Sequence, residues 1–238
     1  MDYEELNYQS VSTRQAEAAA AFPALMRKVY VWMALALVIT GFMAYLVATN
    51  ATLLTLIYTN PAVIWVMIGV QLAIVFGVSA AINRLSLPVA TLLFVLYAVI
   101  NGAMFSSIFL VYTASSIATV FFITAGTFGA MSVYGYTTKQ DLTSWRKILM
   151  MALIGLVIAT VVNLFLKSSG LDLILSYVGV LLFVGLTAYD TQKIKEMCLQ
   201  APDASEQMQK YALLGALSLY LDFINLFIYL LRIFGKRE

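Results

Sequence analysis

The feature that most constrains this chain is a series of apolar runs of about 20 residues, each long enough as an α-helix to cross a hydrocarbon core of about 30 Å. The runs lie at residues 29–48, 62–82, 88–111, 117–136, 148–166, 173–192 and 211–231, and the first five contain no charged residue. Strands of a membrane β-barrel would be about ten residues long and would alternate in polarity, which these runs do not. The sequence therefore predicts an all-α membrane protein with seven transmembrane helices.

Composition gives the same result independently. Of the 238 residues, 62% are hydrophobic and 11% are charged, whereas an ordinary globular domain carries about 25% charged residues. Such a chain cannot cover a water-exposed surface with polar groups, so the lipid bilayer is the expected surroundings of most of it. The net charge of +2 is small and forms no basic stripe, so no nucleic-acid partner is predicted.

The N-terminal segment differs from the rest. Residues 1–26 are polar and begin with an acidic cluster, and they lack the basic start and short apolar core of a secretory signal. We interpret residues 1–26 as a polar N-terminal tail, frayed or flexible outside the membrane up to about residue 21, and residues 27–238 as the transmembrane domain. The alanine-rich run just before Pro23 can extend the first helix toward that proline.

The distribution of basic residues predicts the orientation, because lysine and arginine favour the cytoplasmic side. With the N-terminus inside, ten basic residues lie on the cytoplasmic side and four on the opposite side. Those four are Lys167, Arg232, Lys236 and Arg237. If the last apolar segment entered the membrane and returned to the cytoplasmic side, thirteen basic residues would lie on that side and one on the other. The length of this segment favours a complete seventh span instead.

Asp222 is the ionisable group placed deepest in the predicted membrane region, about twelve residues into the last run. A charged group at the bilayer centre costs roughly 2.5–3.5 kcal/mol on insertion scales. Ser218, Asp222, Asn225 and Tyr229 recur at helical spacing and share one face. The stripe is either an interhelical hydrogen-bond clamp or a site that responds to protons or cations. We favour the second interpretation, because serine or asparagine could form such an interhelical hydrogen bond at a lower free-energy cost than aspartate.

Asp190 ends the sixth run and is followed closely by Lys193 and Lys195. It is either a solvated charge at a helix end or a partner of Asp222. Helix spacing places Asp190 shallower than Asp222, so their contact requires a tilt or an extension of the last helix through residues 205–210. Two carboxyl groups in contact titrate as a coupled pair, which provides a protonation switch in a chain without histidine.

Other polar residues carry weaker signals. Gln71 lies inside the second run, and a glutamine at such a position more often makes a hydrogen bond that supports packing than it binds a ligand. Arg84 ends the second helix, either as an interfacial anchor or as a group that reaches an interior carboxylate. The single cysteine, Cys198, excludes an intrachain disulfide. No cofactor and no resident metal are predicted.

The stretch from Val184 to Lys193, Val-Gly-Leu-Thr-Ala-Tyr-Asp-Thr-Gln-Lys, resembles the signature of the Bax inhibitor-1 family. Similarity to the bacterial inner-membrane branch extends over residues 71–86, 105–112, 130–141 and 210–237. The resemblance implies seven helices, six of them packed around a central C-terminal helix, in an inner membrane.

The resemblance also implies a function. The family is associated with a pH-sensitive calcium leak in which two aspartates, matching Asp190 and Asp222, share a proton. An arginine that latches the first of them matches Arg84. Where the family often has a pore glutamate, this chain has Gln71, which removes one negative charge and puts calcium selectivity in question. The expected transported ions are calcium and protons.

Two other classes of function can be compared with these residues. Intramembrane aspartyl proteases need Tyr-Asp in one helix and Gly-x-Gly-Asp in the next; Tyr189-Asp190 fits, but Leu219-Tyr220-Leu221 precedes Asp222. Such proteases also need a Pro-Ala-Leu element late in the chain, whereas here it occurs only at residues 23–25, before the first helix. An enzyme is therefore not predicted. The remaining alternative is an interaction protein that modulates a membrane protease or stress-response complex, with the tail at residues 1–26 as its contact.

Overall fold

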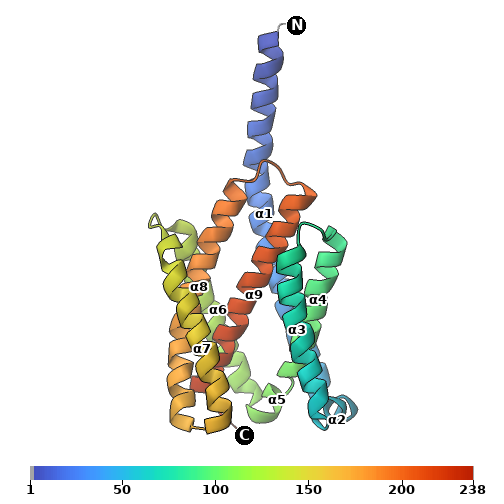
Figure 1. The fold of residues 1–238 in the computed structure, drawn as a ribbon, viewed down its shortest axis with the longest axis vertical. Coiled ribbons are helices and arrows are strands. Elements are labelled where there is room, and N and C mark those ends of the chain that lie inside the picture. The colour runs from blue at the N-terminus through green and yellow to red at the C-terminus, as the bar shows by residue number, and fades with distance from the viewer. Residues whose placement is uncertain (1–2, 238) are drawn as a thin grey trace. The chain divides into compact units, whose positions relative to one another are not determined.

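The computed structural model describes residues 3–237, and for residues 3–19 it describes the backbone alone. This part of the chain is built from helices joined by short turns (Figure 1). The α-helices are α1 (Tyr3–Ala48), α2 (Ala51–Tyr58), α3 (Pro61–Ala81), α4 (Leu87–Phe105), α5 (Ile108–Val111), α6 (Ala114–Thr137), α7 (Arg146–Leu166), α8 (Ser169–Leu199) and α9 (Glu206–Phe234), and a 3₁₀-helix, η1 (Leu142–Trp145), precedes α7.

Within residues 3–237, seven segments are long and apolar enough to span a membrane, which confirms the predicted all-α membrane fold. They are Ala20–Ala48, Pro61–Ala81, Leu87–Val111, Ala114–Thr137, Leu142–Leu166, Ser169–Leu199 and Glu206–Phe234.

Several helix ends differ from the prediction. The sixth and seventh helices run to Leu199 and from Glu206, beyond the apolar runs at 173–192 and 211–231. The added turns contain glutamate, glutamine, lysine and methionine, which favour helix even where they do not favour lipid. At the other end of the chain, the backbone is helical from Tyr3, with Pro23 inside the helix, where a frayed tail is predicted. The short helices α2 and α5 were not predicted.

The chain forms two compact units. The first comprises the residues up to Phe105 together with Ile194–Leu217, and the second comprises Ser106–Lys193 together with the residues from Ser218 onward. Helices α8 and α9 contribute to both units, and each unit is described separately below.

In the first unit, α1 and α4 pack with their backbones close together. A Cβ atom at Gly102 of α4 would collide with the carbonyl oxygen of Thr40 on α1, and the Thr40 hydroxyl donates a hydrogen bond of 3.0 Å to the carbonyl of Ala98. The first turns of α9 belong to this unit and are fixed by polar contacts: the Lys210 ammonium donates to the carbonyl of Leu85 at 2.9 Å.

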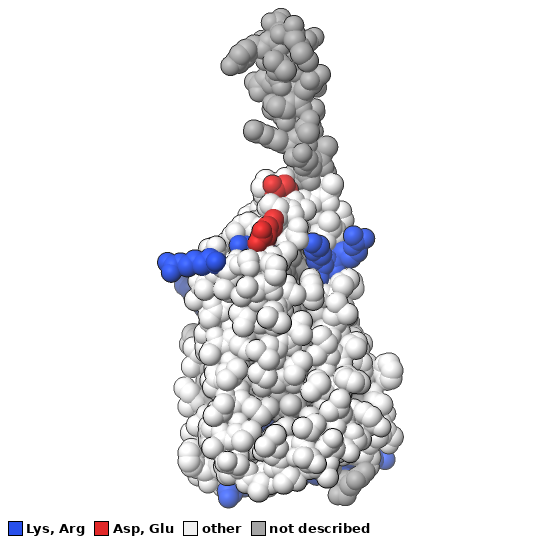
Figure 2. All heavy atoms as spheres, turned by 90° about the vertical axis from the view of Figure 1, so that its right-hand side faces the viewer, with Lys and Arg blue, Asp and Glu red and all other residues white. Residues whose placement is uncertain are grey.

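Charge is distributed as expected for membrane-spanning helices. On the face drawn in Figure 2, which is the side of α3 and α4, charged side chains gather near the ends and leave a broad, largely uncharged belt between them. Large apolar side chains are exposed in this region, among them Trp65 at 69% and Phe76 at 68%. Lipid is the solvent that tolerates such exposure.

The second unit contains a similarly close crossing, between α6 and α8. A Cβ atom at Gly135 would overlap the carbonyl group of Ala188, and the Thr191 hydroxyl lies 3.5 Å from that of Ser132. On the α9 side of α6, Phe223 packs edge-on against Phe128, with ring centroids 5.4 Å apart. Small residues therefore allow α6 to approach α8, while aromatic rings fill the space toward α9.

Helix α9 is the most buried of the seven spans. Of its most apolar 18-residue window 72% is buried, against 6–44% for the other six spans. The protein itself therefore covers most of this window of α9.

The Gly135–Ala188 crossing gives a prediction for stability. We expect Gly135→Ala to destabilise the protein by about 1–3 kcal/mol, because two rigid backbones must separate to admit the methyl group. The measurement is the free energy of unfolding, or the thermal midpoint, of the full chain in detergent micelles.

Gly129→Ala is the matched control. Gly129 lies on the same helix and has nothing within 4 Å of its Cβ position, so alanine there should be neutral or stabilising by up to about 1 kcal/mol. Equal midpoints for the two variants would contradict the close crossing.

Candidate functional site

The second unit brings Asp190 of α8 and Asp222 of α9 together, close enough for the two carboxyl groups to act on each other. Asp222 is 5% exposed, and its Oδ2 atom has no hydrogen-bond partner among the residues that the structure describes. Asp190 is half-buried. The two acids form a pair inside the membrane-spanning region.

This proximity has a direct chemical consequence. Ionised carboxylates are acceptors only, so two of them form a hydrogen bond with each other only when one carries a proton. Two bare carboxylates at this distance would repel strongly in a low-dielectric surrounding. The pair is therefore an arrangement suited to holding one shared proton.

The meeting of the two acids depends on helix geometry. Spacing alone places Asp190 shallower than Asp222, and a tilt or an extension of the last helix was the condition for contact. Helix α9 begins at Glu206 and lies oblique to α8 (Figure 1), so both conditions are present.

A cavity of about 430 Å³ adjoins the acid pair and is lined by α7, α8 and α9. Beyond the first residue of α7, its α7 wall is apolar, with Leu149, Leu153 and Leu156. Its α9 side carries the complete polar stripe predicted from the sequence: Ser218, Asp222, Asn225 and Tyr229. The stripe therefore faces a cavity between helices, and the Asn225 amide also donates to the carbonyl of Leu221 at 2.8 Å.

Two cations line the same cavity, Arg146 at the start of α7 and Lys193 three residues after Asp190. The Lys193 ammonium is close enough to act electrostatically on Asp190. Sequence reasoning counted both cations as indicators of orientation and did not place them at the site. The signal for Lys193 was its position at i+3 from Asp190, since residues three apart are neighbours on a helix surface.

Tyr229 closes one side of the cavity. Its ring stacks on Phe183 with centroids 5.9 Å apart, and its position depends on Gly179, where a Cβ atom would lie 2.6 Å from the ring. Tyr229 is thereby held against α8.

The remaining predicted residues belong to the first unit. The Gln71 amide donates to the side-chain oxygen of Asn101 at 3.1 Å, which is the contact expected of a packing hydrogen bond. Arg84 is exposed in the turn that follows α3, and its role as a latch stays a prediction.

Sequence reasoning missed a second role in the signature stretch, that of Gln192. Its side-chain oxygen accepts from the backbone N–H of Leu142 at 2.8 Å, and its amide donates to the carbonyl of Gln140 at 2.8 Å. Asp141, between them, caps η1 by accepting from the N–H of Thr143 at 2.8 Å, and this hydrogen bonding lowers the pKa of Asp141. Gln192 thus fixes the loop between α6 and α7 to the helix that carries Asp190.

Among the described side chains, no group of three or more histidine, cysteine, aspartate or glutamate residues is arranged to hold a metal ion.

The described residues form seven membrane-length helices, and the last of these is the most buried. It shares an acid pair with the helix before it. These features define a multi-span helical membrane protein with an intramembrane acidic site. Residues 23–238 match the family model described as "Inhibitor of apoptosis-promoting Bax1". The chain belongs to the Bax inhibitor-1 family, which confirms the resemblance noted in the sequence.

Relatives match over nearly their whole length. The chain is 52% identical over 220 residues to "Inner membrane protein YbhL" of Escherichia coli K12, covering 92% of this chain and 94% of the relative. It is 46% identical over 211 residues to an uncharacterised protein of Borreliella burgdorferi, with 89% and 91% covered. A Rickettsia prowazekii protein is 44% identical over 216 residues, with 90% and 89% covered.

The clamp made by Gln192 gives a second prediction. We expect Gln192→Leu to leave the buried N–H of Leu142 without its partner, at a cost of about 1–3 kcal/mol, and to speed amide hydrogen exchange at Leu142. Exchange is measured by mass spectrometry on the full chain in detergent. Gln140→Leu is the control, because the contact of Gln140 with Gln192 uses its backbone carbonyl. Unchanged exchange at Leu142 in Gln192→Leu would contradict the clamp.

Proposed function

We propose that this protein is a pH-sensitive cation leak, with calcium as the principal ion, gated by the Asp190–Asp222 pair. The observation that carries the proposal is the position of the two carboxyl groups, within reach of each other beside a cavity lined by the polar face of α9.

The gating step follows from the chemistry of the pair. In the closed state one proton is shared and Asp222 stays buried. Loss of that proton leaves two carboxylates whose repulsion favours separation of α8 from α9 beside the cavity. The opened cavity then offers the oxygen ligands that calcium prefers, supplied by the acids and by Ser218 and Asn225.

The balance of charge around the path supports a slow leak. Arg146 and Lys193 line the cavity and oppose the entry of cations. Gln71, at the position where the family often has glutamate, is neutral and hydrogen bonded to Asn101. In this proposal Arg84 latches Asp190 in the closed state, as the family resemblance implies.

The proposed location is a bacterial inner membrane, which the name of the Escherichia coli relative states for that protein. The N-terminus is proposed to be cytoplasmic, because that orientation places ten of the fourteen basic residues inside.

A second candidate function has one supporting observation. Helix α1 starts at Tyr3 and runs as continuous helix into the span that begins at Ala20, so its first part is a preformed helix outside the apolar window. Such a helix suits docking to another membrane protein, such as a protease or stress-response complex. Loss of association upon deleting residues 1–19, with flux intact, would favour this function.

The test of the gate is calcium flux into liposomes that contain the full chain, measured from pH 6 to pH 8. Because the closed state holds the shared proton, we expect wild-type flux to rise several-fold as the pH increases. In Asp190→Asn and Asp222→Asn the pair can no longer carry two charges, so the pH dependence should be lost.

Asp203→Asn is the matched control, since Asp203 lies in the loop between α8 and α9 and accepts from the N–H of Ser205 at 3.0 Å, a contact that asparagine also makes. It should behave as the wild type. Identical, pH-independent flux in all four proteins would overturn the proposal.

A further inference from the structure

A second cavity, of about 580 Å³, lies within the second unit where α7 ends, α8 begins and α9 ends. Its lining includes three basic residues and one acidic residue: Lys167, Arg232, Arg237 and Asp172. The three basic residues are among the four that the predicted orientation leaves on the side where basic residues are uncommon. We call this site the basic cavity.

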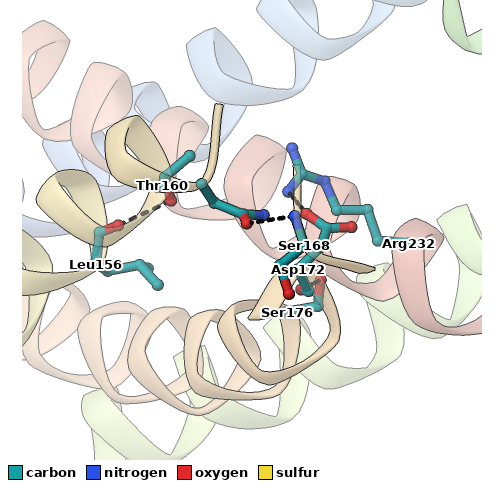
Figure 3. Close-up of polar contacts among 7 residues, drawn as sticks. Leu156, Thr160, Ser168, Asp172, Ser176 and Arg232 are labelled. Carbon is teal, nitrogen blue, oxygen red and sulfur yellow. Dashed lines mark hydrogen bonds and ion pairs between the residues drawn. The ribbon is translucent and has the colours of Figure 1, made fainter. Parts of the chain in front are cut away.

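The arginines of the basic cavity are held in place. Arg232 donates from Nη1 to Asp172 Oδ1 at 3.0 Å, as Figure 3 shows, and the two side chains remain 33% and 39% exposed. The Arg232 guanidinium also lies 5.6 Å from the centre of the Tyr229 ring. A guanidinium has five N–H donors, so the contact with Asp172 leaves most of them able to bind a further acceptor.

Arg237 is fixed by the chain that follows α9. Its guanidinium lies 6.0 Å from the centre of the Tyr112 ring. The preceding residue, Lys236, donates its N–H to the Ser116 hydroxyl at 2.9 Å and accepts from the N–H of Thr113 at 3.1 Å. These contacts hold Arg237 at the cavity without neutralising it.

The turn between α7 and α8 supplies the third cation and several polar groups. Lys167 adopts a left-handed conformation, with φ of 50°, and ends α7. The N–H of Ser168 then donates to the Asn163 side chain at 3.1 Å, and the Ser168 hydroxyl accepts from the N–H of Leu171 at 3.3 Å. Among the residues that the structure describes, one carboxylate faces three cations, so the cavity has an excess of positive charge and suits an anion.

The surroundings indicate what kind of anion. The last turn of α7 exposes Leu164 at 64%, Phe165 at 83% and Leu166 at 63%, and the first turns of α8 expose Leu173 at 49% and Ile174 at 60%. These apolar side chains adjoin the basic cavity along the chain and lie within the spans. A basic pocket between transmembrane helices at the end of an apolar surface is suited to a lipid headgroup whose acyl chains follow that surface.

We propose that the basic cavity binds the phosphate of an anionic phospholipid headgroup, through Lys167, Arg232 and Arg237. The Asp172 carboxylate orients Arg232, and the acyl chains lie against the exposed ends of α7 and α8. This site is separate from the cavity of the acid pair and does not depend on the proposed leak.

The test is a titration of the detergent-purified full chain with phosphatidylglycerol or phosphatidylcholine, followed by native mass spectrometry and by the thermal midpoint. We expect phosphatidylglycerol to bind and to raise the midpoint, and phosphatidylcholine to do neither at the same concentrations. Lys167→Gln and Arg237→Gln should each weaken phosphatidylglycerol binding about fivefold, without changing the midpoint in the absence of lipid.

The matched control is Lys147→Gln, which removes an exposed basic residue near the opposite end of α7 and should leave binding unchanged. Three outcomes would overturn the proposal: equal binding of the two lipids, equal weakening by the control, or wild-type binding in both cavity variants. A fourth outcome concerns inorganic phosphate. If it raises the thermal midpoint as much as phosphatidylglycerol does, the cavity binds a soluble anion and the lipid site is overturned.

Discussion

The structure depends on a carboxyl group that is buried in an apolar helix. Asp222 lies in the span with the greatest burial, and a charged group near the bilayer centre is costly wherever it contacts lipid. The helix that carries it must therefore be covered by protein, and the acid must find a polar partner. Asp190 is that partner, and the polar face of α9 continues the arrangement through Asn225 and Tyr229.

Placing Asp190 beside Asp222 requires α8 to be held firmly. Gly135 allows the backbone of α6 to touch that of α8 at Ala188, and Gln192 ties the loop after α6 to the same helix by two hydrogen bonds. These contacts lie within one turn of Asp190 on α8. The signature stretch thus combines a titratable group with the residues that position it, so its sequence serves packing and chemistry together.

The seven spans could be predicted because bilayer thickness sets a minimum length for an apolar run. The ends of the last two helices could not, because beyond the lipid helix propensity decides where a helix stops, and the residues around Glu196 and Glu206 favour helix. The shared face of Ser218, Asp222, Asn225 and Tyr229 follows from helical periodicity alone. The contact with Asp190 does not, since it depends on the obliquity of α9.

The cations illustrate another limit of sequence reasoning. Counting lysine and arginine by side of the membrane treats them as equivalent, whereas Lys193 lines the acid cavity and Arg232 pairs with Asp172. The C-terminal basic residues that argued against a seventh span have partners of their own. Arg232 contacts Asp172 and the ring of Tyr229, and Arg237 lies over the ring of Tyr112. Such partners come from helices far apart in the sequence, and no local pattern reveals them.

Helix α7 connects the acid cavity to the bilayer itself. Its 21 residues extend about 31 Å at about 1.5 Å per residue, and basic residues flank both ends. Because 6% of its most apolar window is buried, lipid contacts most of its surface. A thinner membrane would tilt this helix through hydrophobic mismatch and shift the wall formed by Leu149 and Leu153, so the thickness of the surrounding bilayer becomes a determinant of the space beside the acids.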